Sequence, residues 1–152
     1  MFNPVPLNLP SYPFKLKNDG DKTYIFDPFR KKFLVLTPEE WVRQHLVQYL
    51  VNYKNYPAGL IKLEGGLTLN SLQKRTDVIA FDVAGNKVLL AECKAPTIKI
   101  SQKVFDQIAR YNFIHHIEVL LVSNGIEHFC CRVDFEKRSY EFLKEIPFYC
   151  KK

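Results

Sequence analysis

Residues 75–94 read RTDVIAFDVAGNKVLLAECK, and this stretch decides the fold that we expect for the whole chain. Two apolar runs flank the turn-forming pair Gly85-Asn86, which is a hairpin signal. We therefore predict antiparallel strands over residues 76–83 and 87–93. Their apolar character predicts that both strands are buried in a sheet.

The predicted hairpin brings three charged side chains close together, those of Asp77, Glu92 and Lys94. If Gly85 and Asn86 are the two central turn residues, Asp77 falls opposite Lys94, and Glu92 stands on the diagonal, roughly 7–8 Å away. The three would then share one face, where two carboxylates can hold a divalent cation and a lysine can orient or deprotonate a bound water. A surface salt-bridge ladder is the alternative, and a three-residue loop would turn Asp77 to the other face.

The flanking sequence predicts helices packed on this sheet. Thr37-Pro38 is a helix start, and the helix is expected to reach about Asn52. A second amphipathic helix is predicted to start at Ser101. Further strands are predicted over residues 23–26, 32–36, 60–63, 117–122, 126–135 and 138–143. This order predicts an α/β protein with a mixed β-sheet core flanked by helices.

The ends of the chain and its cysteines suggest an intracellular protein. Residues 1–22 are predicted to be a proline-rich N-terminal arm laid over a single domain, residues 23–152. The arm lacks the basic start of a signal or transit peptide, and no apolar run approaches the ~18 residues of a membrane span. No CxxC pair occurs, so we expect reduced thiols, with Cys93 and Cys131 packed as small hydrophobic residues. Cytoplasm is the expected location.

Composition narrows the class of partner. The 152 residues include 22 Lys and Arg against 16 Asp and Glu, which gives a net charge of +6 and permits, without requiring, a nucleic-acid partner. Aromatic residues at 14% and only six glycines exclude collagen, coiled coil and wholesale disorder. The absence of a Walker loop, a GxGxxG motif and a nucleophile elbow argues against nucleotide, dinucleotide and serine-hydrolase chemistry.

The acid of one strand followed by Glu-x-Lys on the next resembles the motif of the PD-(D/E)xK nuclease superfamily, here Asp77 and Glu92-Cys93-Lys94. Thr76 stands where the superfamily name has proline, a residue that shapes the backbone and binds no metal. From about Phe26 to Tyr149 the chain is similar to small proteins related to the N-terminal nuclease domain of type I restriction enzyme R subunits. The segments that carry this resemblance are Pro38–Gln44, Arg75–Asp77, Glu92–Pro96, Phe105–Asn112 and Ser123–Gly125.

This resemblance implies a restriction-endonuclease-like fold and a site. Asp77 and Glu92 match the metal-binding acids, and Lys94 matches the catalytic lysine. The family also places an acid on the first helix, for which helical phase favours Glu39, while Glu40 suits a helix cap. The pair Gln107 and Tyr111 looks like a Q-x-x-x-Y signature whose glutamine lies near the active site, although core packing explains Tyr111 equally well.

The function implied is a Mg²⁺-dependent DNA nuclease, in which Mn²⁺ can substitute. The alternative is a non-catalytic module that binds DNA or a partner on a nuclease fold. Partners expected are DNA and either a second copy of the chain or other restriction or repair proteins, but no membrane. The predicted nucleic-acid contacts are Lys74, Arg75, Lys99, Lys103, Arg110 and Tyr111, with Arg43 and the Arg30–Lys32 cluster as weaker candidates.

Overall fold

The computed structural model describes residues 3–67 and 74–150, and their side chains except at 64–67, 74–77, 111 and 113–115. The predicted α/β class is confirmed, with two α-helices, one three-stranded sheet and one six-stranded sheet among the described residues. In chain order the elements are β1 (Leu16–Asp19), β2 (Lys22–Asp27), β3 (Lys32–Val35), α1 (Pro38–Tyr53), the 3-10 helix η1 (Ala58–Leu60), β4 (Ile61–Leu67), β5 (Lys74–Phe81), β6 (Lys87–Cys93), α2 (Gln102–His115), β7 (Val119–Ser123), β8 (His128–Asp134) and β9 (Ser139–Leu143).

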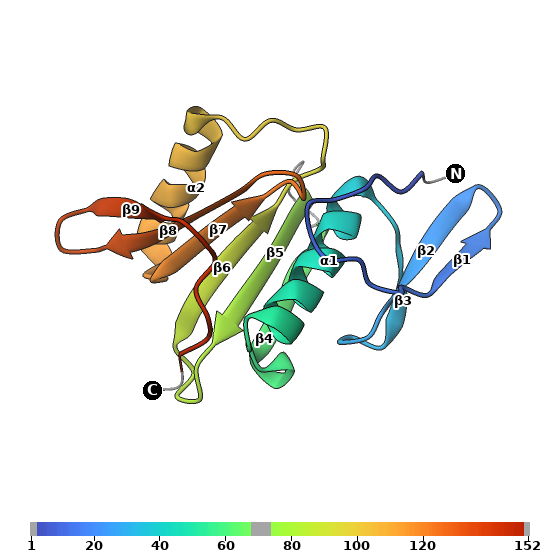
Figure 1. Ribbon diagram of the computed structural model, residues 1–152, viewed down its shortest axis with the longest axis horizontal. Helices are drawn as coiled ribbons and strands as arrows, with labels where there is room; N and C mark the ends of the chain where they lie inside the picture. The colour runs from blue at the N-terminus through green and yellow to red at the C-terminus, as the bar shows by residue number, and fades with distance from the viewer. Residues whose placement is uncertain (1–2, 68–73, 151–152) are drawn as a thin grey trace.

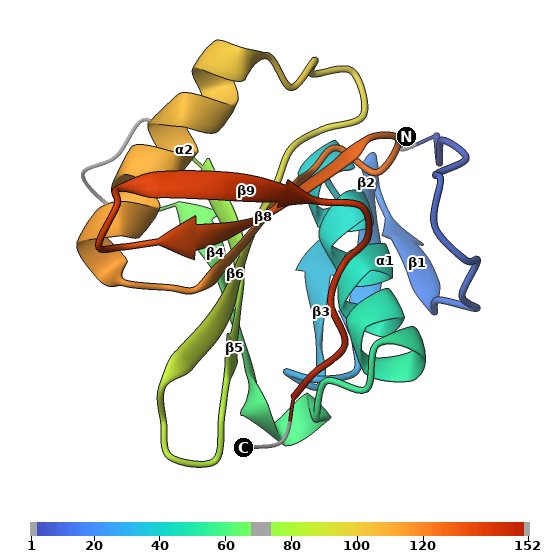
Figure 2. The same ribbon diagram turned by 60° about the vertical axis from the view of Figure 1, so that its left-hand side comes forward.

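The large sheet is mixed, as predicted, and has the order β4-β5-β6-β7-β8-β9 (Figure 1). Strands β6 and β7 run parallel, while the other neighbouring strands of this sheet run antiparallel. A parallel pair needs a long crossover connection, and α2 supplies it between β6 and β7 (Figure 1 and, turned by 60°, Figure 2). The small sheet β1-β2-β3 lies on the far side of α1 from the large sheet (Figure 1).

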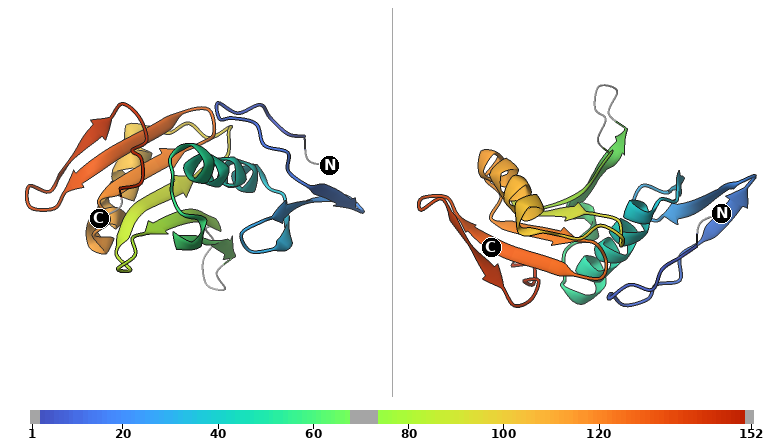
Figure 3. Two further views of the ribbon diagram at one scale, coloured as in Figure 1. Left: turned by 60° about the horizontal axis from the view of Figure 1, so that its bottom comes forward. Right: turned by 90° about the horizontal axis from the view of Figure 1, so that it is seen from above.

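The two helices cover opposite faces of the large sheet (Figure 3). Leu46 of α1 packs in one core cluster with Leu89 and Ala91 of β6. Leu90, between those two strand residues, packs in the other cluster with Phe105 of α2. Because successive residues of a strand alternate, Glu92 belongs to the α2 face.

The first helix forms as its sequence predicts. Thr37 is the N-cap, and its Oγ1 accepts a hydrogen bond from the backbone N–H of Glu40 at 3.1 Å. The inward stripe Val42, Leu46 and Leu50 is fully buried. A stripe at this spacing faces the sheet along the whole helix, so α1 is fixed in rotation as well as in position.

The loop between β5 and β6 differs from the predicted two-residue turn. It spans Asp82–Asn86, and the Asp82 carboxylate accepts hydrogen bonds from the N–H groups of Ala84 (2.9 Å) and Asn86 (2.8 Å). The hydrogen bonds from Asn86, and then that from Ala84, hold the pKa of Asp82 below its ordinary value. Gly85 has φ of +88°, a conformation that glycine adopts without strain. The longer loop is therefore set by a side chain that the turn prediction ignored.

A β-bulge follows this loop. Phe81 pairs with Lys87, but Ala80 pairs with Leu89, so Val88 is an extra residue on β6. If the Phe81–Lys87 pairing continued without the bulge, every residue of β5 before it would face a partner of the opposite side. The extra residue therefore returns β5 to the register in which its buried side chains face the same side as those of β6.

The bulge also changes the pairing of the candidate acid. Asp77 pairs with Glu92, so the predicted pairing of Asp77 with Lys94 is wrong by two residues. Because faces alternate with a period of two, a two-residue shift leaves Asp77 and Glu92 at positions on the same face. The predicted common face is therefore kept although the predicted register is not.

The N-terminal arm lies across the domain. Trp41 of α1 donates its indole N–H to the carbonyl of Val5 at 3.0 Å, and the backbone N–H of Asn8 donates to Gly125 at 2.7 Å. A Cβ at Gly125 would meet Cδ2 of Leu7 at 2.7 Å, and Gly125 has φ of +85°, so glycine lets the arm approach this closely without strain. The sequence missed β1, which lies within residues 1–22 and pairs with β2.

The cysteines form no disulfide within the described chain. Cys93 and Cys131 are buried in the two core clusters, which agrees with their predicted role as small hydrophobic residues. Burial raises the pKa of Cys130 and Cys131 to about 12, so both thiols stay protonated. In residues 3–67 and 74–150, no helix has the length and apolar character that crossing a membrane requires.

A buried polar network joins the β2–β3 turn to α1. The fully buried Asp27 carboxylate accepts hydrogen bonds from the N–H groups of Phe29 (2.8 Å) and Arg30 (3.0 Å), from Nε of Arg30 (2.9 Å) and from Nε2 of Gln44 (3.2 Å). Burial acts to raise the pKa of Asp27, but the hydrogen bonds from Arg30, Phe29 and Gln44 outweigh it, and the pKa lies below 3.8.

The part of this network that belongs to α1 buries Arg43, one of the predicted DNA contacts. Gln44 also donates to Glu40 at 3.0 Å, and the Glu40 carboxylate forms an ion pair with Arg43. Arg43 is only 2% exposed, so it is not a surface contact for DNA, as its charge had suggested. A buried charge with a partner of this kind has a structural role.

Replacing Asp27 with Ala is expected to lower the free energy of unfolding by about 3 kcal/mol, because Arg30 and two backbone N–H groups lose a buried acceptor. Urea unfolding at neutral pH measures the change. Asp21→Ala, at an exposed turn position, is the control and should stay within about 0.5 kcal/mol of the wild type. A change of the same size in both variants would contradict the role of the network.

Stability is expected to fall as the pH drops below 6.5, because of His45. Burial lowers the pKa of His45 below its ordinary 6.5, against the opposing hydrogen bond to the Trp41 carbonyl. The unfolded chain therefore takes up a proton first as the pH falls, and the folded chain loses stability until the pH passes its own lower pKa. Chemical unfolding between about pH 7 and pH 5 should show a smaller loss in His45→Phe than in wild type. The exposed-site control, His116→Asn, should keep the wild-type loss.

Candidate active site

Glu92 and Lys94 lie together at one end of the large sheet. Nζ of Lys94 is 3.6 Å from Oε1 of Glu92, and the two side chains are 33% and 12% exposed. This is the contact that the salt-bridge alternative predicts, and it is also the acid–lysine arrangement of the predicted nuclease motif. A carboxylate this sheltered is costly to keep ionised, so it favours cationic partners.

Asp77 occupies the neighbouring position on β5. It pairs with Glu92 on one side and with Glu64 of β4 on the other. Residues that pair directly across antiparallel strands belong to the same face, with Cα atoms about 4.5–5.5 Å apart. The side chain of Asp77 lies outside the described side chains, so the register is what connects it to Glu92.

The site lies where the parallel strands end. The backbone N–H of Lys94 donates to the carbonyl of Ser123 at the end of β7, at 2.8 Å. Helix α2 begins at the same end, with Ser101 as its N-cap and no acidic residue in its first turn. Crevices beyond the carboxyl ends of parallel strands are the usual ligand sites of such sheets, and helix N-termini favour anions.

Asn124 holds this end of the sheet together, a role that the sequence did not reveal. Its amide Nδ2 donates to the carbonyl of Ile98 at 2.9 Å, and its Oδ1 accepts from the N–H groups of Ile126 (2.9 Å) and Glu127 (2.7 Å). Asn124 thereby ties the loop that follows Lys94 to the β7–β8 turn. A polar residue directly after the buried strand β7 was the available signal.

Helix α2 turns one polar strip outward. Phe105 and Ala109 pack on the sheet, and Gln107, half a turn from both, is exposed. Lys103 and Arg110 are exposed on the same outer side of the helix. The structure therefore groups Gln107 with two cations, but it faces outward instead of onto the strand of Glu92, and its catalytic role stays a prediction.

A network at the start of α2 fixes its rotation. Tyr140 of β9 donates its hydroxyl to Asp106 at 2.9 Å, and Gln102 donates to Asp106 at 2.9 Å. These two hydrogen bonds, that of Gln102 first, hold the pKa of Asp106 below its ordinary value. Burial, and then Asp106, raises the pKa of Tyr140. The strip that carries Gln107 is locked in orientation by this contact.

The two helix acids have different surroundings. Glu40 is held by Arg43 and Gln44 in the buried network, which explains it without a catalytic role. Glu39 is partly exposed in the first turn of α1. Since α1 covers the face opposite to Glu92, Glu39 would have to reach the site around the end of the sheet, and its part in metal binding stays a prediction.

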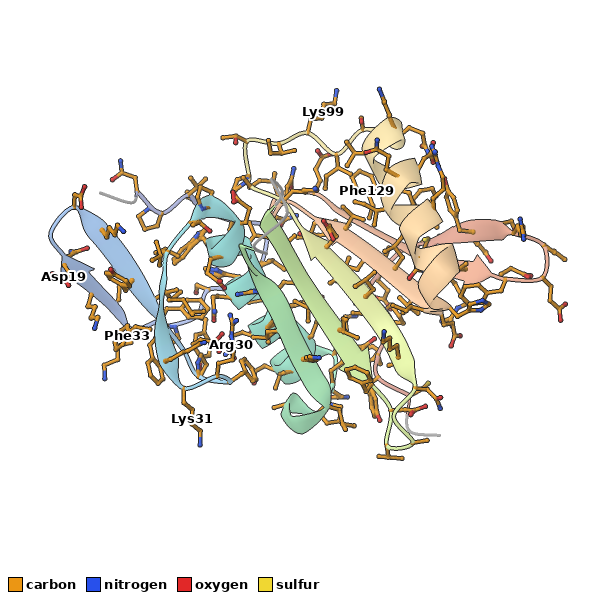
Figure 4. The ribbon with its side chains drawn as sticks, turned by 180° about the vertical axis from the view of Figure 1, so that it is seen from behind. Asp19, Arg30, Lys31, Phe33, Lys99 and Phe129 are labelled. Atoms are coloured by element: carbon orange, nitrogen blue, oxygen red, sulfur yellow. The ribbon has the colours of Figure 1, made fainter. Side chains whose placement is uncertain are left out.

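The remaining predicted nucleic-acid contacts divide into those whose side chains the structure describes and those whose side chains it does not. Lys99 is exposed on the loop between β6 and α2 and extends from the end of the sheet marked by Phe129 (Figure 4). Lys74 and Arg75 begin β5, and Tyr111 belongs to α2, but their side chains lie outside the described ones. Of the main predicted contacts, Lys99, Lys103 and Arg110 therefore have described side chains, and all three are exposed.

Comparison with known families identifies the chain. A family model described as "Type I restriction enzyme R protein N terminus (HSDR_N)" matches residues 38–147, well over half of the sequence. The chain belongs to this family. The match begins with α1 and ends beyond β9, so it includes the whole large sheet and the residues of the candidate site.

The R-protein N-terminal family suggests a nuclease-related role in a restriction system. No curated protein and no solved structure matches the chain in the other two comparisons. The arm and the β1-β2-β3 sheet precede the matched residues.

The donor set fits a hard divalent cation. Carboxylate oxygens are the ligands that Mg²⁺ prefers, and Glu92 offers a sheltered carboxylate with Asp77 paired beside it. Among the side chains that the structure describes, no three His, Cys, Asp or Glu residues converge on one point. The side chain of Asp77 is not among those described. A metal ion at the candidate site would be bound by Glu92 together with Asp77.

Mg²⁺ is expected to raise the melting temperature of the wild type but not of Glu92→Gln. At a concentration tenfold above Kd a ligand adds about 1.4 kcal/mol, or roughly 3–6 °C for a chain of this size. Differential scanning fluorimetry with and without Mg²⁺ or Mn²⁺ measures the shift. Glu141→Gln, another strand carboxylate, is the matched control and should retain it. Equal shifts in both variants would remove Glu92 from the metal site.

Proposed function

We propose that this member of the R-protein N-terminal family is a metal-dependent deoxyribonuclease that hydrolyses DNA phosphodiester bonds. The observation that carries the proposal is the pairing of Asp77 with Glu92, together with Lys94 Nζ at 3.6 Å from the Glu92 carboxylate. Two acids and a lysine at one end of a sheet supply a cation site and a positive group for the phosphate. The family assignment supports the same class of reaction.

Each residue has a separate task in this proposal. Asp77 and Glu92 would hold Mg²⁺, or Mn²⁺ in its place, and Glu39 is the third candidate ligand. The bound cation supplies Lewis acidity at the scissile phosphate and a more acidic water. Lys94 positions the attacking water and offsets the charge that builds on the phosphate.

The exposed cations provide the track for DNA. Lys99, Lys103 and Arg110 would contact backbone phosphates, and Gln107 lies between the last two on the outer strip of α2. Lys74, Arg75 and Tyr111 are proposed to extend this surface along β5 and α2. We propose that the chain acts on DNA in the cytoplasm, with a second copy or other restriction or repair proteins as partners.

One observation favours the non-catalytic alternative. Lys94 is already in contact with Glu92. In the non-catalytic alternative, this ion pair stabilises the strand end and has no other role. In that case the fold would bind DNA or a partner without cutting. The metal shift described above separates the two, because a purely structural ion pair gains nothing from Mg²⁺.

Lys94→Ala and Glu92→Gln are each expected to reduce Mg²⁺-dependent DNA cleavage at least about a hundredfold, because each removes a group that acts on the reacting phosphate. Supercoiled, linear duplex and single-stranded DNA should all be assayed, with and without Mg²⁺. Glu141→Gln is again the matched control and should cleave as the wild type does. Circular dichroism and melting temperature confirm that the variants are folded.

Cleavage that persists in both site variants would contradict the assignment of the active site. A Mg²⁺-induced melting shift without cleavage of any of the three DNA forms would instead favour a metal-binding module that needs a partner to act.

A further inference from the structure

The small sheet turns one face into the protein and one face outward. Along β2 the residues Thr23, Ile25 and Asp27 are buried, whereas Tyr24 and Phe26 between them remain partly exposed. Asp27 anchors the buried face to α1 through Gln44. The outward face therefore presents aromatic rings that the rest of the described chain does not fully cover.

These rings form a contiguous cluster with a lysine. Tyr24 pairs with Lys17 of β1 and Val35 of β3, and Phe26 pairs with Phe33 of β3. The rings of Phe26 and Phe33 have centroids 5.2 Å apart. Nζ of Lys17 lies 4.2 Å from the centroid of Phe33 and 5.7 Å from that of Tyr24. We call Lys17, Tyr24, Phe26, Phe33 and Val35 the aromatic-lysine face.

The segment around this face is strongly basic. Six Lys and Arg and three Asp lie between Lys15 and Val35, so the segment carries half of the net charge of +6. Asp27, one of the three acids, is buried and bound by Arg30. Lys31 extends from the turn at one end of the sheet, opposite the tip that carries Asp19, with Phe33 between them (Figure 4).

We infer that the aromatic-lysine face binds single-stranded DNA. Aromatic rings on an open sheet take stacked bases, and lysines beside them contact the phosphates. Duplex DNA hides the faces of its bases, so stacking requires single strands. The face lies outside residues 38–147 and does not depend on the candidate active site, although the choice of DNA over RNA rests on the proposed nuclease function.

The position of Lys17 argues for a polyanion over a protein partner. Lysine is depleted from the cores of protein–protein interfaces, where it would lose its hydration. Here Lys17 reaches over two rings at the centre of the face instead of its rim. A cation held over aromatic rings places a positive charge next to each stacking position. This charge arrangement matches a strand in which bases and phosphates alternate.

The test is binding of a labelled oligo(dT), followed by fluorescence anisotropy in EDTA so that no cleavage interferes. Tyr24→Thr and Phe33→Thr are each expected to weaken binding about tenfold, because each removes a stacking ring. Threonine keeps the strand propensity of these positions, and melting temperatures check that the variants are folded. Lys17→Gln should weaken binding and lower the salt dependence by about one phosphate contact.

Phe148→Thr is the matched control. Phe148 is 53% exposed and also has a lysine over its ring, with Nζ of Lys54 at 4.3 Å, but it lies outside the small sheet. This variant should bind oligo(dT) as the wild type does. An abasic oligomer of equal length should bind the wild type about tenfold more weakly than oligo(dT), since it has no bases to stack.

Three results would overturn the inference. These are unchanged oligo(dT) binding in folded Tyr24→Thr and Phe33→Thr, a loss of duplex DNA binding in these variants as large as their loss of oligo(dT) binding, and an abasic oligomer bound by the wild type as tightly as oligo(dT). Binding to phosphatidylserine vesicles that the same variants abolish while oligo(dT) binding persists belongs to the first of these results. Because the assay contains no metal and measures no cleavage, its outcome is separate from that of the nuclease assay.

Discussion

The β-bulge at Val88 is the constraint on which the candidate active site depends. The loop Asp82–Asn86 is fixed by the Asp82 carboxylate, and its length alone would set β5 out of phase with β6. The extra residue restores the phase, so Asp77 pairs with Glu92 and the buried faces of both strands remain buried. A single inserted residue thus keeps both the core and the candidate site intact, because both depend on the alternation of side chains between the two faces of the sheet.

A second constraint lies on the other side of α1. Asp27, Gln44 and Glu40 form a chain of buried hydrogen bonds from the β2–β3 turn to the helix. Such a network is costly to desolvate and gives more specificity of position than net stability. It fixes the small sheet against the same helix whose opposite side packs on the large sheet. The aromatic-lysine face is therefore held rigidly to the domain.

Much of the fold could be predicted from periodicity and caps. The helix that starts after Thr37, the strand 87–93 and the common face of Glu92 and Lys94 follow from local rules that the structure obeys. Strand β1 was missed because all four of its residues are exposed, so it has no apolar alternation to detect. The pairing of Asp77 was missed because it depends on a side chain within the loop and on one bulged residue.

Buried charge was the other source of error. Arg43 looks like a surface cation in the sequence. Glu40 stands three residues before it on the same predicted helix, but only the fold shows that both are enclosed. Asn124 likewise looks like a turn residue, although it connects two loops through Ile98. Residues that only the tertiary structure brings together leave no local pattern in the sequence. The sequence therefore predicts the chemistry of such residues better than it predicts which residues they contact.

The contact of Leu7 with Gly125 has a consequence for the order of folding. The arm precedes its binding site, the β7–β8 turn, by more than a hundred residues. Contacts of such separation form late, because a long loop must be closed before they are gained. The part of the arm before β1 therefore docks only when the large sheet is nearly complete, and its four prolines keep it extended and unsuited to pairing with strands in the meantime. Docking of the arm on the β7–β8 turn is therefore a late step of folding.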